Sequence, residues 1–515
     1  MPLGRTLSIV LAGLEAHVVT VEADVGAGLP KMVWTGLPDT AVRQSESRVK
    51  SAVKSSHESW PAVCITIGLS PASLRKSGSG FDLPVAVAVL AAAGAVDVKL
   101  VRDLVVIGEL GLDGRVHPVT GALPAVIGAV RLGYLRIVVP RANAAEAGLV
   151  PGAEVIAVGS LAELCARLRG EPVDIEDDPL PLLTMPGSAP DLADVVGQGE
   201  ARRAMEVAAA GGHHVFLTGP PGVGKTMLAE RLPGLLPDLS EQQALEVSSI
   251  HSLLGRLPAG RPLLTRPPFC APHHTATVAS LIGGGTGIPA PGTISLAHHG
   301  VLFIDEGTEF ERRTLDALRQ PLESGTITIN RGGGMATYPS RFQLVLAVNP
   351  CPCAKGGRSS DPSNCMCSAV EMRAYRNRVS GPLLDRIDLR ARLAPISRAI
   401  LTAGATGEPS AAVRERVEVA RDRAGRRLRG TPWATNAELP GPVLRTRFPL
   451  PSDALGTLRI DTDRGQLSSR GVERVMKVAW TLADLAGHDL PDLADVDAAR
   501  SLRYGAEAAA MARSA

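Results

Sequence analysis

Aromatic side chains, cysteine and long apolar runs are all scarce in this chain of 515 residues. Aromatic residues make up only 3% of the sequence, so an array of stacking platforms for single-stranded bases is not available. The longest uncharged, mostly apolar run, residues 83–96, contains Pro84 and is shorter than the about 20 residues that span a bilayer. We therefore expect no membrane helix.

Other absences narrow the class of protein further. Glu15 and His17 interrupt the only apolar stretch near the N-terminus, so no secretory leader is expected and the sequence favours a cytoplasmic protein. A net charge of +2 gives no global attraction to polyanions, and any nucleic-acid surface must be local. Seven cysteines in so long a chain do not form a disulfide scaffold.

The most informative segment is a complete G-x-x-x-x-G-K-T phosphate-binding loop. It consists of Gly219, Pro220, Pro221, Gly222, Val223, Gly224, Lys225 and Thr226. A short apolar run, 215–218, precedes it, and a segment of helical composition, 227–232, follows it, as a P-loop requires. The motif predicts that backbone N–H groups wrap a polyphosphate, Lys225 reaches the β- and γ-phosphates of ATP, and Thr226 ligates Mg²⁺.

Two further apolar strands end in polar residues that suit ATP hydrolysis. The strand 300–304 leads into Asp305, which suits the Mg²⁺ shell, and Glu306, which can polarise the attacking water. The strand 344–348 ends at Asn349, whose amide can hold the lytic water or the γ-phosphate. Each feature alone also fits a plain buried strand or a turn, so these assignments depend on the P-loop.

The remaining sequence divides into an α/β N-terminal part and a helical C-terminal part. Residues 1–170 alternate β-rich runs with helical segments, 171–190 is an acidic, proline-rich linker, 191–396 holds the nucleotide motifs, and 397–515 has helical patterns only.

Together these motifs resemble an AAA+ ATPase. With the segments 380–389 and 468–471, they resemble more narrowly the magnesium-chelatase-like YifB/ComM family over nearly the whole chain. The resemblance implies three parts: an N-terminal Lon-protease-like (ribosomal S5 domain 2-like) domain, a central AAA+ P-loop NTPase domain and a C-terminal helical lid. It also implies a homo-hexameric ring in which Arg386 reaches the neighbour's γ-phosphate and Arg470 senses nucleotide from the lid. Without the motif context, each arginine is better explained by a surface ion pair.

The interval between Thr226 and Asp305 is longer than one helix, one strand and short connections need. It resembles the helix-2 insertion of the family. A second candidate hairpin, 327–338, has β-rich arms around a glycine tip. In ring translocases of this clade such hairpins face the central pore, where Arg331 can track phosphates; the alternative is a structural hairpin at the domain edge.

Two clusters of metal-binding side chains occur in the ATPase region. Cys351, Cys353, Cys365 and Cys367 form two C-x-C pairs that can close a structural zinc site, although C-x-x-C is the usual spacing and four reduced cysteines are the alternative. The histidines of the second cluster occur in adjacent pairs, which we expect to point to different sides of an extended chain and to make interdomain hydrogen bonds. They are His273, His274, His298 and His299.

The N-terminal domain raises the question of proteolysis. Its glycine-rich segments, 68–82 and 108–116, resemble the Lon-protease-like fold. Aligning them places Gly80 where the family keeps its nucleophilic serine and Leu123 where it keeps the activating lysine. Ser79 lacks an evident basic partner, so an inert domain is favoured.

The leading hypothesis is therefore an ATP-driven motor on branched or single-stranded DNA, similar to ComM-type helicases that promote branch migration in recombination and natural transformation. The alternatives are a magnesium-chelatase motor subunit acting on a tetrapyrrole and, less favoured, an ATP-dependent protease. Two arginine- or lysine-rich helices add only weak support for DNA, because solvated or salt-bridged faces explain them nearly as well. They carry Arg43, Arg48, Lys50 and Lys54 in one case and the arginines of 414–429 in the other.

Overall fold

The computed structural model describes residues 3–36, 39–74, 76, 78–173, 190–258, 260–285, 287–331, 334–354, 365–395, 407–464 and 467–504. Most of the expected linker, residues 174–189, lies outside these ranges, as does the end of the last expected helix after Tyr504.

A seven-stranded mixed sheet organises the N-terminal part, in the order β3-β4-β2-β1-β5-β8-β9. The strands are β1 (Gly4–Ala12), β2 (Glu15–Gly26), β3 (Lys31–Thr35), β4 (Cys64–Ser70), β5 (Val105–Val106), β8 (Arg136–Pro140) and β9 (Glu154–Val158). β2 runs antiparallel to β1 and β4, whereas the other neighbours are parallel. A small hairpin, β6 (Glu109–Leu110) with β7 (Val116–His117), forms a separate two-stranded sheet.

Helices give this sheet two separate apolar cores. The first includes α1 (Thr40–Ser55), α2 (Asp82–Ala92), α3 (Val98–Val101) and α6 (Leu161–Arg169); the second includes α4 (Ala122–Arg131) and α5 (Ala144–Ala147). All residues of α2 are buried, which explains why its sequence is apolar throughout and shows no amphipathic period.

The central part is built on a five-stranded parallel sheet in the order β11-β14-β17-β10-β18. Its strands are β10 (Val215–Thr218), β11 (Phe269–Cys270), β14 (Val301–Ile304), β17 (Gln343–Val348) and β18 (Leu389–Arg392). All residues of β14 and β17 are buried, as near-continuous apolar runs in a parallel sheet require. The helices are α7 (Gly199–Gly211), α8 (Lys225–Leu235), α9 (Glu241–Leu253), α10 (Val278–Ile282), α11 (Thr293–Leu296), α12 (Arg312–Asp316), α13 (Arg319–Ser324), α14 (Ala369–Arg376) and α15 (Gly381–Leu384).

Two hairpins extend from this central part and pack on each other. One pairs β12 (Gly283–Gly284) with β13 (Ala290–Pro291), and the other pairs β15 (Thr326–Arg331) with β16 (Gly334–Pro339). The buried Tyr338 hydroxyl donates a 2.6 Å hydrogen bond to the carbonyl of Pro289, which fixes the second hairpin against the first. The expected hairpin at 327–338 is thus confirmed.

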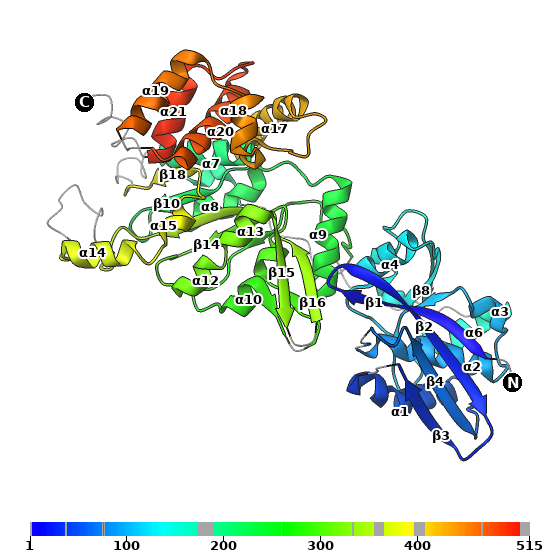
Figure 1. The fold of residues 1–515 in the computed structure, drawn as a ribbon. Coiled ribbons are helices and arrows are strands. Elements are labelled where there is room, and N and C mark those ends of the chain that lie inside the picture. Colours follow the sequence, from blue (N-terminus) through cyan, green and yellow to red (C-terminus); the bar gives the residue numbers. More distant parts are fainter. Residues whose placement is uncertain are drawn as a thin grey trace.

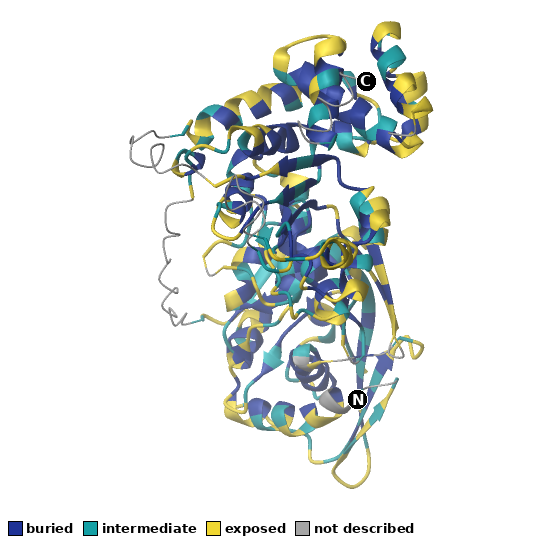
Figure 2. Ribbon diagram, turned by 90° about the vertical axis from the view of Figure 1, so that its left-hand side faces the viewer, coloured by how far each residue is buried: buried dark blue, intermediate teal, exposed yellow. Residues whose placement is uncertain are grey.

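The C-terminal part is helical, as expected. It contains α17 (Ser410–Arg427), α18 (Gly441–Thr446), α19 (Ser452–Asp463), α20 (Ser469–Ala486) and α21 (Leu493–Tyr504). Buried side chains such as Val417 and Val475 share one continuous apolar core with Leu217 of the parallel sheet. The dark blue, buried residues accordingly continue from the sheet into the helices in Figure 2.

The N-terminal part meets the central part along α9 and the second hairpin (Figure 1). The Gly121 N–H donates a 2.9 Å hydrogen bond to the carbonyl of Ser252, and the Ser252 hydroxyl donates to Glu146 at 2.6 Å. The tip of the β1–β2 hairpin also reaches β16, where a side chain at Gly13 would lie 3.2 Å from the Thr337 carbonyl. The N-terminal part is thus joined to both α9 and β16.

Within the described residues, no helix is both long and apolar enough to cross a membrane. The expected fold class, a mixed α/β chain with a central P-loop domain and a C-terminal helical domain, is confirmed.

Candidate functional site

Three neighbouring parallel strands end at one edge of the central sheet and bring the sequence motifs together. β10 pairs with β17 so that Thr218 lies opposite Val348, and β17 pairs with β14 so that Leu346 lies opposite Ile304. The residues that follow these strands therefore meet at the same edge. They are Gly219, Asp305 and Asn349.

The loop after β10 has the backbone that its glycines allow. Gly222 and Gly224 have φ angles of 78° and 96°, in the left-handed region that favours glycine. Gly224 caps the N-terminus of α8, whose first residue is Lys225. The loop thus leads into the positive end of a helix dipole, where a phosphate is favoured.

Lys225 lies at the centre of the site and is buried. Its Nζ donates hydrogen bonds to the carbonyls of Gly219 and Pro220, at 2.6 and 3.1 Å, and to Asn349 Oδ1 at 3.0 Å. Burial lowers the pKa of Lys225, while the charges of Asp305 and Glu306 oppose that shift. The ammonium group is therefore held at the place where the motif requires it to meet phosphate.

Thr226 and Asp305 form a pair suited to a magnesium ion. The Thr226 hydroxyl donates to Asp305 Oδ2 at 2.8 Å, although 79 residues separate the two in sequence. A hydroxyl oxygen beside a carboxylate is the kind of donor set that Mg²⁺ takes in nucleotide sites. The residues present therefore fit ATP with Mg²⁺, which would supply electrostatic stabilisation of the transferred phosphoryl group.

Glu306 follows Asp305 in a strained conformation. Its φ is 49°, which is uncommon for a residue with a side chain and is found at functional sites. The carboxylate is half exposed, and His274 Nδ1 lies 3.9 Å from its Oε2. Glu306 is therefore open to water beside the predicted phosphate position. No pattern in the sequence predicted that His274, from the long insertion, would lie next to it.

The two arginines predicted for the site lie elsewhere in this chain. Arg386 is buried after α15, where it donates to the Pro382 carbonyl at 2.5 Å and to the Glu323 carboxylate. Arg470 is exposed at the start of α20. Within the described residues, neither forms a hydrogen bond or ion pair with Lys225 or with the carboxylates after β14.

The four clustered cysteines converge although they come from two segments. The sulfur of Cys353 lies 3.4 Å from Cys351 and 3.6 Å from Cys365, and all four sulfurs lie within 4.8 Å of one another. None forms a disulfide. A tetrahedral zinc ion with Zn–S bonds of about 2.3 Å separates its sulfurs by ~3.8 Å. The cluster, which includes Cys367, therefore has the dimensions of a Cys₄ zinc site.

The histidine pairs contradict the expectation of opposite directions and interdomain bonds. The rings of His298 and His299 lie 3.9 Å apart, and both Nε2 atoms are 3.3 Å from Glu246 Oε2 of α9, in the same domain. The physical reason is the backbone of His299, whose φ of 55° turns the chain so that adjacent side chains face the same way. His273 and His274 are also adjacent, with ring centroids 4.1 Å apart.

The Glu246 cluster resembles a metal site in its spacing but not in its protonation. The backbone N–H of Arg341 donates to His298 Nδ1 at 3.0 Å, and a backbone amide can only donate. The Nε2 atom of neutral His298 therefore carries the proton and donates to Glu246, so its lone pair is not available to a metal. The cluster is a hydrogen-bonded clamp between α9 and the turn before β14.

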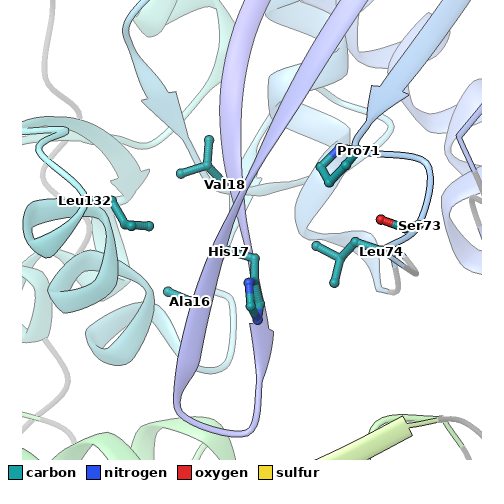
Figure 3. A pocket seen from close by; sticks show the side chains of 7 residues that line it. All are labelled: Ala16, His17, Val18, Pro71, Ser73, Leu74 and Leu132. Carbon is teal, nitrogen blue, oxygen red and sulfur yellow. The ribbon is translucent and has the colours of Figure 1, made fainter.

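The N-terminal domain has no visible proteolytic dyad in its described residues. Leu123, at the position where Lon-type proteases keep a lysine, is fully buried in an apolar core. A pocket of about 340 Å³ lies beside the β1–β2 hairpin and contains His17 and Ser73 (Figure 3), but no hydrogen bond between these two occurs in the described part of the chain. The side chain of Ser79 lies outside that part.

Several of the basic residues that suggested polyanion binding form ion pairs within the chain. Arg48 forms a 2.6 Å ion pair with the buried Asp82, which leaves the other three basic residues of α1 exposed. In α17, Arg416 pairs with Glu206 at 2.6 Å, and Arg427 pairs with Asp484 at 2.5 Å. A salt-bridged helix surface thus explains much of the arginine content of α17.

One residue near the site had no signal in the sequence. Tyr375 of α14 is buried, and the guanidinium of Arg378, which donates to the Thr308 carbonyl at 3.1 Å, lies 5.7 Å from its ring centre. A tyrosine that follows a cysteine-rich loop has no motif that would connect it to a strand end.

Comparisons with known proteins agree with this geometry. A family model described as subunit ChlI of Mg-chelatase matches residues 21–143, one described as magnesium chelatase, subunit ChlI, matches 191–401, and one for the ChlI C-terminal part matches 407–503. An uncharacterized protein of Mycobacterium tuberculosis is 50% identical over 98% of this chain and 99% of its own length.

Two further relatives also align over nearly their whole length. The uncharacterized protein YifB of Escherichia coli is 41% identical over 93% of this chain and 92% of its own. The competence protein ComM of Haemophilus influenzae is 39% identical over 95% of this chain and 94% of its own. The chain, with its assembled P-loop, acidic strand end and strand-terminal asparagine, belongs to the YifB/ComM family of magnesium-chelatase-like AAA+ ATPases.

Proposed function

We propose that this protein is an ATP-hydrolysing ring motor, most simply a homo-hexamer, that moves branched or single-stranded DNA. The activity that fits best is branch migration in homologous recombination or natural transformation. Glu306 would activate water, Asn349 would orient it, and Arg386 and Arg470 would act on the nucleotide from a neighbouring subunit and from the lid.

The observation that carries the DNA proposal is the β15–β16 hairpin. Arg331 and Met335 are exposed near its end, and Arg331 forms no ion pair with any described residue. The hairpin extends away from the sheet toward the lower edge of Figure 1, whereas its base is fixed to β12–β13 through Tyr338. The guanidinium of Arg331, which has no ion pair among the described residues, is free to bind a DNA phosphate, and the hydrogen bond of Tyr338 holds the hairpin in place.

Two further observations support this direction. The same hairpin contacts the β1–β2 tip of the N-terminal domain, so a movement of the hairpin on DNA would be transmitted to that domain. In addition, the relative from Haemophilus influenzae is named a competence protein, which fits work on incoming DNA.

The alternatives are weaker on physical grounds. A magnesium-chelatase motor would share the ATPase site, and the family models of the front and central domains carry that name, but the exposed arginine hairpin favours DNA. A Lon-like protease would need a lysine near its serine, and the buried Leu123 occupies that position.

We also propose that the four cysteines hold a structural zinc ion. Thiolates at these separations repel one another unless a cation binds them, and zinc is the ion that four thiolates select. The ion would pin the segment between Asn349 and α14 without taking part in hydrolysis.

The DNA proposal is tested by ATPase assays with single strands, duplex and four-way junctions, using wild type and Arg331→Ala. We expect stimulation by branched or single-stranded DNA, and a loss of most of it in the variant without change in the rate measured without DNA. The logarithmic salt dependence of DNA binding should become shallower by about one unit per lost phosphate contact.

Arg131→Ala is the matched control, because Arg131 is an exposed arginine of α4 in the N-terminal domain and lies outside the basic segments considered for DNA binding. If no DNA structure stimulates hydrolysis and none is remodelled, the DNA motor is excluded. A rate that instead rises with a tetrapyrrole and its partner subunits would favour the chelatase alternative.

A further inference from the structure

Asp388 is a fully buried carboxylate that directly precedes β18, the edge strand of the central sheet. It follows Arg386 by two residues in sequence. Figure 1 shows β18 directly beneath the C-terminal helices. The carboxylate therefore lies at the junction between the central domain and the helical part of the chain.

The two oxygens of Asp388 are bound from opposite sides of this junction. On the side of the central domain, the backbone N–H of His214 donates to Oδ2 at 3.2 Å, and His213 Nδ1 lies 3.4 Å from the same oxygen. On the helical side, the Arg474 guanidinium of α20 donates to Oδ1 at 2.9 Å. Burial alone would raise the pKa of Asp388, but the charge of Arg474 helps to hold it well below its usual range. The carboxylate is thus ionised, and a buried charge of this kind depends on its partner.

Further contacts join the same segment to the C-terminal helices. His213 is fully buried, and its Nε2 shares a 2.7 Å hydrogen bond with the hydroxyl of Thr481, two turns after Arg474 in α20. The guanidinium of Arg503 in α21 donates to the backbone carbonyl of Ile387. Two helices of the C-terminal part therefore hold residues 386–388 in place.

The ion pair of Asp388 also relates the two arginines that are proposed to act on nucleotide. Arg386 lies two residues before Asp388, and Arg470 lies four residues before Arg474, on the same face of α20. A rotation of α20 that moves Arg470 must carry Arg474 with it, because both belong to one helix. Such a rotation either breaks the buried ion pair or displaces the segment that carries Arg386.

We propose that Asp388 is a positioning residue that couples the helical part of one subunit to the nucleotide of the next, because through Arg474 it makes Arg386 move together with Arg470. This inference rests on the proposed roles of Arg386 and Arg470 in a ring of subunits. It adds a route by which the nucleotide state of one subunit sets the rate of hydrolysis in its neighbour.

The first test measures ATP hydrolysis without DNA for Arg474→Gln, which removes the charge that holds Asp388. We expect kcat to fall about tenfold while the affinity for a fluorescent ATP analogue stays within about twofold, because the P-loop is unchanged. Arg500→Gln is the matched control, because Arg500 forms a comparable buried ion pair with Asp461, at 2.7 Å, between α21 and α19. It should lose stability but keep its kcat. A wild-type kcat in Arg474→Gln, or an equal loss in Arg500→Gln, overturns the proposal.

The second test asks whether Asp388 and Arg474 act as one pair. Asp388→Asn should also lower kcat, and the double variant with Arg474→Gln should be no slower than the slower single variant, because both changes remove the same ion pair. The double variant leaves neither charge of the pair behind, so its rate can be measured where a single variant folds poorly. Losses that multiply would mean that the two residues act independently, which contradicts the proposal.

The third test locates the effect in the neighbouring subunit. Arg386→Ala subunits, which keep an intact Glu306, are mixed with Glu306→Gln subunits, which are inactive but supply Arg386. Adding Arg474→Gln to the Glu306→Gln subunits should lower the rate of the mixture about tenfold, whereas adding Arg500→Gln should not. Because these subunits do not hydrolyse ATP themselves, any loss must come through the arginine that they supply. Equal rates with and without Arg474→Gln contradict the coupling.

The mixtures also separate this inference from the proposed function. If the unmodified Glu306→Gln subunits restore hydrolysis and Arg474→Gln changes nothing, only the coupling through Asp388 is lost. If no mixture restores hydrolysis, the proposed role of Arg386 is lost together with the coupling. All measurements omit DNA, so a protein that hydrolyses ATP but ignores DNA would exclude the DNA motor and leave this inference standing.

Discussion

Lys225 Nζ donates a 3.0 Å hydrogen bond to Asn349 Oδ1 across the ends of two strands, although 124 residues separate them in sequence. The parallel pairing of β10 with β17 brings the two residues to the same edge of the sheet, because it aligns Thr218 with Val348. Lys225 of the P-loop and the strand-terminal amide of Asn349 are therefore one hydrogen-bonded unit. A phosphate that attracts Lys225 must also change what Asn349 holds, which suits a residue that senses the γ-phosphate.

The carboxylate of Glu306 is expected to serve hydrolysis and not binding. Glu306→Gln keeps the size of the side chain and removes the base, so the hydrolysis rate should fall by a factor of about 10² to 10⁴. Affinity for ATP should stay near wild type, because Lys225 and the loop remain intact. Steady-state ATPase and equilibrium binding of a fluorescent analogue distinguish the two. A variant that loses both would place Glu306 in binding instead.

The His298–Glu246 clamp predicts a loss of stability in mild acid. Burial lowers the pKa of His298 to about 4, and the hydrogen bonds from His298 and His299 lower the pKa of Glu246. The pKa of a histidine in the unfolded chain is near 6.5. As pH falls from about 6.5 toward 4, the unfolded state therefore binds a proton at His298 that the folded state does not bind, and the free energy of unfolding decreases. The lowered pKa of Glu246 also makes the free energy of unfolding decrease in acid, but at pH values below the ordinary Glu pKa of 4.5.

The measurement is urea unfolding at several pH values between 7.5 and 5. Burial also lowers the pKa of His214 to about 4, so the wild-type slope has more than one source. His298→Gln, which cannot be protonated, should show a shallower fall with acidification than wild type. Equal slopes for the two proteins would mean that the clamp does not contribute.

Much of this site follows from local sequence, and the exceptions have identifiable physical causes. The P-loop, the acidic strand end and Asn349 were predictable because parallel strands end at a common edge, and the long apolar runs mark those strands. The direction of the His298 and His299 side chains could not be predicted, because it depends on the positive φ of His299, and histidine is not a residue that indicates a positive φ.

Contacts made after a long loop were also beyond sequence reasoning. The ion pair of Arg386 needs Glu323 from a separate helix, and the hydrogen bond from Arg378 to the Thr308 carbonyl joins a segment after the cysteine loop to one after β14. Both contacts depend on how separate segments pack against the sheet, and no sequence pattern relates these segments to one another.

The cysteine cluster predicts a zinc ion that stabilises the chain. Purified protein should contain about one zinc per chain, and Cys353→Ser should lose most of it, because a Cys₄ site needs all four thiolates. Thermal unfolding should shift to lower temperature both in this variant and after treatment with a strong chelator. Cys64→Ser is the control, since Cys64 is a half-buried cysteine of the N-terminal domain, far from the cluster in sequence. Zinc-free protein with unchanged stability would contradict the prediction.

The contact between Arg386 and Glu323 leads to a prediction about which subunit's nucleotide Arg386 acts on. Arg386 is bound to Glu323 within its own chain and has no contact with its own P-loop among the described residues, so any role in catalysis requires a neighbour. Arg386→Ala should lower hydrolysis by a factor of about 10³, as expected for an arginine finger. Glu306→Gln is also inactive but keeps its arginine.

Mixing these two inactive variants is the decisive measurement. In a mixed ring, the intact Glu306 site of an Arg386→Ala subunit can receive Arg386 from an adjacent Glu306→Gln subunit, so hydrolysis should reappear and depend on the mixing ratio. A finger that acted within one chain would leave every mixture inactive. Mixing Glu306→Gln with Lys225→Ala is the matched control, because neither of these subunits has a complete site to rescue. Recovery only in the first mixture would therefore assign Arg386 to the neighbouring subunit's nucleotide.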